Sequence, residues 1–135
     1  MAELRNLSVH IDRPAAEVYA FVVEPANLPR WASGLGGQLV QDGVDWFVET
    51  PEGRARFAFV PRNEHGILDH EVWTPSGETV SMPMRAIADG DDECDVVMTL
   101  RRGASMTDDD FARDIAAVSH DLEQLRTVLE GDVVR

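Results

Sequence analysis

The stretch TDDDFARDIAAVSHDLEQLRTVLEG, residues 107–131, decides how this chain is built. Its apolar residues recur at alternating spacings of four and three, which is the period of one helix face. They are Phe111, Ile115, Val118, Leu122, Leu125 and Leu129. Thr107 and Asp110 have the spacing of a capping box, and three aspartates oppose the positive end of the helix dipole. The pattern predicts one long amphipathic helix over residues 108–130.

Upstream of this helix lie five turn signals at nearly even spacing, each a polar residue followed by glycine. They are Asp42-Gly43, Glu52-Gly53, His65-Gly66, Ser76-Gly77 and Asp89-Gly90. Short β-rich runs between such turns are typical of consecutive antiparallel hairpins. With an opening strand at residues 7–11 they predict seven strands, and Pro83 predicts a bulge, bend or break in the sixth. A curled sheet closed by a long helix is a container for a small, largely apolar molecule.

Composition narrows the class of protein. The 135 residues, 44% of them apolar, suffice for one domain with its own core, which we expect over residues 1–135. The net charge of −13 argues against nucleic acid and anionic membranes as partners. All twelve basic residues are arginine, which excludes Schiff-base chemistry and a P-loop lysine. With no apolar run long enough for a membrane span, no signal-peptide pattern and one cysteine, Cys94, we predict a cytoplasmic protein.

The opening of the chain carries a family resemblance. Residues 8–22, SVHIDRPAAEVYAFV, predict a strand and a short helix begun at Pro14, and residues 24–31, EPANLPRW, predict a second short helix. Together with the closing helix, these segments resemble the helix-grip superfamily, which contains START domains, the birch-pollen allergen and polyketide cyclase/dehydrase-like proteins. The resemblance covers nearly the whole chain. Residues 67–72 and 83–85 look like those of a bacterial subgroup.

The resemblance implies an α+β fold. We therefore expect a seven-stranded curved antiparallel sheet, two short helices and one long C-terminal helix. Members of the superfamily include lipid carriers, hormone receptors and aromatase/cyclases, so the resemblance specifies the fold far more closely than the activity.

Side-chain alternation along the strands identifies the residues that line the cavity. Apart from a thiol, His70 is the one titratable side chain predicted on the inner sheet face. It could act as a general acid or base, or be an inert hydrogen-bonded histidine. Asp114, at the edge of the helix stripe, is the second catalytic candidate: it could reach into the cavity, or be a solvated carboxylate on the flank of the helix. The predicted ligand-contacting residues are Trp31, Trp46, Phe57, Phe59, His70, Met82, Met84, Met98, Phe111, Ile115 and Val118.

Three functions fit these observations. The leading one is binding of a small hydrophobic or aromatic molecule in a pocket between the sheet and the C-terminal helix. The second is an enzyme of the polyketide cyclase, dehydrase or isomerase kind, with His70 transferring protons. The third is an interaction module without a pocket. No spacing of histidine, cysteine and carboxylates resembles a metal site, and no cofactor is expected. The helix stripe could also pair with a second copy, which leaves a homodimer open.

Overall fold

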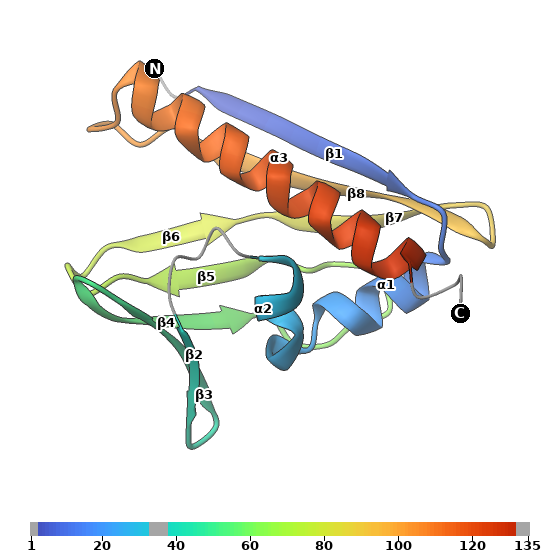
Figure 1. Ribbon diagram of the computed structural model, residues 1–135, viewed down its shortest axis with the longest axis horizontal. Helices are drawn as coiled ribbons and strands as arrows, with labels where there is room; N and C mark the ends of the chain where they lie inside the picture. Colours follow the sequence, from blue (N-terminus) through green and yellow to red (C-terminus); the bar gives the residue numbers. More distant parts are fainter. Residues whose placement is uncertain (1–2, 33–37, 132–135) are drawn as a thin grey trace.

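The computed structural model describes residues 3–32 and 38–131 (Figure 1). In chain order the elements are β1 (Leu4–Ile11), α1 (Ala15–Val22), the 3₁₀ turn η1 (Pro25–Asn27), α2 (Leu28–Trp31), β2 (Gln38–Asp42), β3 (Asp45–Thr50), β4 (Gly53–Phe59), β5 (His70–Trp73), β6 (Thr79–Met82), β7 (Met84–Asp89), β8 (Glu93–Arg101) and α3 (Asp108–Gly131). The predicted α+β architecture, with short helices near the N-terminus and one long C-terminal helix, is confirmed.

The described residues form eight strands in two antiparallel sheets, so the predicted single sheet of seven strands is wrong. One sheet has the order β1-β8-β7 and the other the order β2-β3-β4-β5-β6. The extra strand arises at Pro83, where the predicted sixth strand divides into β6 and β7, because proline has no N–H for the ladder. The next N–H, that of Met84, donates instead to Asp69 Oδ1 at 2.8 Å. β6 and β7 follow one another nearly in line and connect the two sheets (Figure 1).

The long helix α3 begins as predicted. Thr107 N–H donates to Asp110 Oδ2 at 3.1 Å, and Asp110 N–H donates to Thr107 Oγ1 at 3.0 Å, which is the reciprocal pattern of a capping box. The helix packs against β1 and α2 and runs along β1 in Figure 1. Leu122, Leu125 and Leu129 of its apolar stripe are buried. None of the described helices is both long and apolar enough to cross a membrane.

The hydrophobic core lies between the β1-β8-β7 sheet and the helices α1 and α3. β8 alternates strictly along this core, with Cys94, Val96, Met98 and Leu100 buried between more exposed residues. This is the period-2 pattern expected of a strand with one face in the core. Leu28 and Trp31 of α2 and Phe57 of β4 belong to the same core, which therefore reaches the β2–β6 sheet.

The segment between β4 and β5 runs beside β7 through Gly66. The backbone of Gly66 is in the left-handed region, at a φ of 71°. Ala86 N–H donates to the Gly66 carbonyl oxygen at 2.9 Å, and a Cβ added to Gly66 would lie 2.3 Å from the Ala86 carbonyl oxygen. Both the conformation and the lack of space therefore require glycine at this position.

We expect Gly66→Ala to lower the free energy of unfolding by about 2–5 kcal/mol, because the strain of a positive φ adds to a clash with a backbone oxygen. Gly43→Ala is a matched control: Gly43 has a φ of 66°, and no heavy atom lies within 4 Å of an added Cβ. It should lose only the conformational part, about 1–2 kcal/mol. Urea titrations of both variants measure the difference. Equal losses would show that β7 moves aside at no cost.

Candidate functional site

A cavity of about 630 Å³ lies between strands β4, β5, β6 and β8, helix α2 and the first half of α3. Most of its wall is apolar. The apolar lining includes Leu28, Trp31, Ala32, Phe57, Phe59, Val72, Met82, Met98, Leu100, Met106 and Val118. This volume falls within the range of about 300–1,000 Å³ that is usual for small-molecule sites.

The rings of His70, Phe57 and Phe59 pack together in this wall. His70 opens β5 and lies in register with Phe59 of β4 and Met82 of β6. The His70 ring centroid is 5.2 Å from that of Phe57 and 5.3 Å from that of Phe59, and the two phenyl rings meet edge to face at 4.9 Å. Alternation along β4 points Phe57 and Phe59 to the same side, which is why the sequence pattern could bring these rings together.

The protonation of His70 follows from its contacts. Its Nδ1 lies 3.0 Å from the Leu68 carbonyl oxygen, which can only accept, so Nδ1 carries the hydrogen and donates it. Burial lowers the pKa of the His70 ring, against the weaker opposing effects of that hydrogen bond and of Asp69. The ring is therefore neutral at pH 7, and its other nitrogen, Nε2, is an acceptor.

His70 is part of the wall of the cavity. His70 is 8% exposed and lines the cavity. Within the part of the chain that the structure describes, Trp31 Nε1 is the only buried side-chain nitrogen or oxygen that lacks a hydrogen-bond partner. Among the described residues, His70 Nε2 also has no hydrogen-bond partner. A neutral imidazole in the wall of an apolar cavity can accept a proton or a hydrogen bond.

The structure brings most of the predicted ligand-contacting residues together. The cavity lining includes Trp31, Phe57, Phe59, His70, Met82, Met98 and Val118, together with Asp114. Four predicted residues do not line it: Trp46, Met84, Phe111 and Ile115. Trp46 lies on the β2–β3 hairpin, which projects away from the rest of the fold (Figure 1). Met84 lies beyond the break at Pro83 and is fully buried in the core.

The orientation of α3 explains the other two differences. Phe111 and Ile115 pack into the core, whereas Val118 of the same apolar stripe also lines the cavity. The cavity is lined by the neighbouring flank of the helix, which carries Asp114, Ala117 and Asp121. Desolvation and, to a lesser extent, the nearby Asp110 raise the pKa of Asp114.

Sequence reasoning missed the part of the wall that comes from a loop. Gly103, Ser105 and Met106 precede α3 and close one side of the cavity. Nothing in the hydrophobic period assigns them to the cavity, because loop conformation leaves no repeating pattern. The residue that could have signalled this loop in the sequence is Arg102, because its side chain holds the loop in place. It donates to the Met106 carbonyl oxygen at 3.1 Å and pairs with Asp108.

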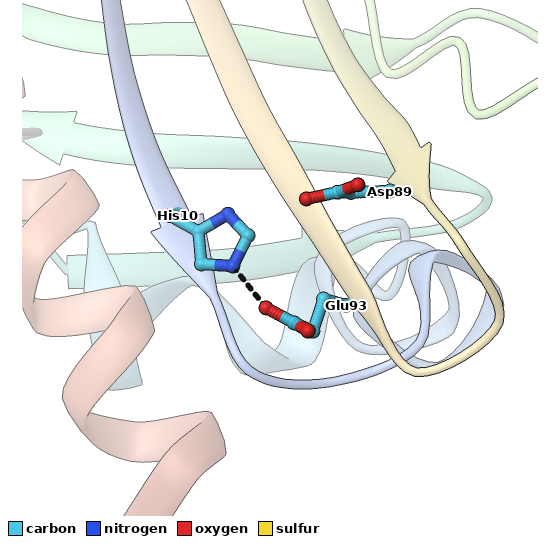
Figure 2. A group of neighbouring side chains, drawn as sticks. All are labelled: His10, Asp89 and Glu93. Carbon is cyan, nitrogen blue, oxygen red and sulfur yellow. Dashed lines mark hydrogen bonds and ion pairs between the residues drawn. The ribbon is translucent and has the colours of Figure 1, made fainter.

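A second cluster of titratable side chains lies on the exposed side of the β1-β8-β7 sheet (Figure 2). His10 Nε2 lies 2.6 Å from Glu93 Oε1, and His10 Nδ1 lies 2.9 Å from Asp95 Oδ1. These two hydrogen bonds raise the pKa of His10 to about 9. The ring is therefore protonated at neutral pH and donates through both nitrogens.

This cluster could also supply metal ligands. One atom each from His10, Asp89 and Glu93 lies within 4.8 Å of the others. The sequence spacing did not reveal it, because the residues come from three strands that only the register brings together. A divalent cation would have to displace a proton from the His10 ring, and the hydrogen bonds from the ring to Glu93 and Asp95 stabilise its protonated form. We therefore interpret the cluster as a cross-strand ion-pair network.

Comparisons with known proteins identify the fold. No protein-family model matches the chain, and no curated protein matches it. The Enterococcus faecalis protein EF2215, of unknown function, has a TM-score of 0.68 at 15% identity, covering 95% of this chain and 71% of that one. CalU16 from Micromonospora echinospora has a TM-score of 0.68 at 13% identity, with coverages of 97% and 76%.

Norcoclaurine synthase from Thalictrum flavum, solved in complex with dopamine and hydroxybenzaldehyde, has a TM-score of 0.60 at 13% identity, with coverages of 96% and 88%. Identities this low establish the fold and leave the activity open. The elements of this chain agree with those expected for the fold: short helices after the first strand, curved antiparallel sheets and a long closing helix. The chain therefore has the helix-grip fold.

Proposed function

We propose that this protein binds a small hydrophobic or aromatic molecule in the cavity around His70. The observation that carries the proposal is the cavity itself, about 630 Å³ with a mostly apolar wall. A recess of this size with a mostly apolar wall is typical of small-molecule sites. The norcoclaurine synthase structure, with two small aromatic molecules bound, supports the proposal by analogy of fold.

A bulky substitution at an exposed residue of the cavity lining tests this proposal, because it fills the cavity and leaves the buried core residues unchanged. Ala117 and Ala116 are neighbouring exposed residues of α3, and only Ala117 lines the cavity. We expect Ala117→Trp to weaken binding of prodan, an uncharged solvatochromic naphthalene dye, by at least about tenfold, because the added ring takes the space of the ligand. Ala116→Trp adds the same ring outside the cavity and should leave the affinity unchanged. A fluorescence titration gives both dissociation constants.

Saturable binding that is equal in the two variants would place the dye elsewhere on the protein and contradict the proposal. So would the absence of saturable binding of any apolar molecule. Native mass spectrometry of protein purified from its own host offers an independent check, because a retained ligand would identify its chemical class.

A second function, proton transfer by His70, is favoured by one specific observation. The Leu68 carbonyl oxygen fixes the tautomer that leaves Nε2 as the acceptor, and His70 lines the cavity. An enzyme that removes a proton from a bound ligand needs a base in this arrangement. An interaction module without a pocket explains neither the cavity nor the placement of this histidine.

A further inference from the structure

We propose that the ligand is an uncharged aromatic molecule whose hydroxyl group donates a hydrogen bond to His70 Nε2. This inference rests on the proposed binding function and goes further, because it names the chemical class of the ligand. Three features of the cavity carry it: the direction of the hydrogen bond at His70, the aromatic and sulfur-containing wall, and the sign of the charges around the cavity.

The hydrogen bond at His70 can run in only one direction. The Leu68 carbonyl oxygen holds the single hydrogen of the neutral ring on Nδ1, at 3.0 Å, so Nε2 can accept and cannot donate. An ether or carbonyl oxygen on the ligand would bring two acceptors together at Nε2, although it could accept from Trp31 Nε1, a lining donor without a partner among the described residues. A hydroxyl group supplies the missing donor. Leaving Nε2 unpaired under a bound apolar ligand costs the desolvation of a polar group, so a ligand with a donor is favoured.

The surroundings of His70 favour a ring over a flexible chain. Phe57 and Phe59 stand edge to face beside it, and aromatic pairs in such arrangements gain energy beyond the area that they bury. Met82 and Met98 add thioether groups, which make favourable contacts with aromatic rings and adapt to their shape. These four side chains line the same cavity as His70, which favours a planar aromatic ligand there.

The charges around the cavity disfavour an anion. The charged lining residues are the acidic Glu78, Asp114 and Asp121 and the basic Arg101. Asp121 is half-buried, and the other three are exposed. A carboxylate ligand would lose its hydration among these groups, and burying a charge without a close partner costs several kcal/mol. His70 does not supply the partner, because burial keeps it neutral at pH 7. Fatty acids and aromatic acids are therefore poor ligands.

Three naphthalene derivatives of similar shape test this inference at pH 7 by isothermal titration calorimetry. For 2-naphthol, which has a hydroxyl donor, we expect about two- to tenfold tighter binding than for 2-methoxynaphthalene, which has only an acceptor. For 2-naphthoate, the anion, we expect at least about tenfold weaker binding than for 2-naphthol. In His70→Phe, which keeps a ring but removes the acceptor, 2-naphthol and 2-methoxynaphthalene should bind equally well.

The wild-type protein gives a second reading in case His70→Phe does not fold. The ¹⁵N resonance of His70 Nε2 should shift when 2-naphthol is added and much less with 2-methoxynaphthalene.

A pair of variants tests the charge argument. Asp114→Asn should reduce the difference in affinity between 2-naphthol and 2-naphthoate. Asp92→Asn makes the same charge change in the exposed turn before β8, outside the cavity lining, and should not alter that difference.

The outcomes separate this inference from the function on which it rests. If 2-methoxynaphthalene or 2-naphthoate binds as tightly as 2-naphthol, the ligand class is wrong and the binding function stands. If no naphthalene derivative binds, and prodan does not bind either, the binding function itself fails.

Discussion

Replacing His70 with glutamine should abolish most of any proton transfer that the protein catalyses. The hypothesis follows from a neutral imidazole that keeps Nε2 as its acceptor, on a residue that lines a mostly apolar cavity. 2-Tetralone is a suitable substrate, because it is uncharged, bicyclic and exchanges the hydrogens next to its carbonyl group with D₂O. If His70 is the base, the protein should accelerate this exchange and His70→Gln should lower the acceleration by about 10²–10⁴-fold. Proton NMR measures the exchange rate.

The pH dependence adds a second criterion. Burial lowers the pKa of His70, so the fraction of neutral base grows as the pH rises through a value below the ordinary 6.5 of histidine. The exchange rate should rise over the same pH range and then level off. His120→Gln is the control, because His120 is exposed on α3 and outside the cavity lining. Exchange that survives His70→Gln unchanged would rule out the catalytic role and leave binding as the better account.

Shortening Leu122 to alanine should be among the most destabilising single changes in the chain. Leu122 is 2% exposed and lies in the core between α3 and the β1-β8-β7 sheet. Removing a fully buried leucine side chain costs about 2–5 kcal/mol, because burial is lost and a cavity remains. Domains of this size are stable by only about 5–15 kcal/mol, so the variant should be marginal.

Gln124→Ala is the control for this measurement. Gln124 is exposed two residues further along the same helix, and its replacement should change the free energy of unfolding by less than about 0.5 kcal/mol. Urea titrations followed by circular dichroism give both values. A loss below about 1 kcal/mol for Leu122→Ala would mean that the apolar stripe of α3 contributes little to the core.

The regular elements were predictable from the sequence because their patterns repeat. The stripe from Phe111 to Leu129 and the capping residues before it predicted α3 to within one residue at its C-terminus. The glycine turns predicted the hairpins. The number of strands was wrong, because a proline inside a β-rich run leaves a bend, a bulge and a break all open. Only the three-dimensional structure shows that Asp69 accepts the Met84 N–H and completes the break.

The cavity was less predictable than the fold. Strand alternation places Phe57, Phe59 and His70 on one face, since it depends only on a period of two. It cannot show how far a hairpin twists away from the body, and so Trp46 was assigned to the cavity although it does not line it. The rotation of α3 about its axis likewise depends on packing, which turns Phe111 to the core and Asp114 to the cavity.

The pairing of the first strand with the last has a consequence for the synthesis of this protein. β1 pairs along its whole length with β8, from Leu4 opposite Arg101 to Ile11 opposite Cys94. Closing a loop of about 90 residues costs about 4 kcal/mol of chain entropy, and a ribosome takes about 5–20 s to make that length. During this time β1 has no partner strand. The cavity is therefore assembled last, and a nascent chain that ends before β8 has no site to offer a ligand.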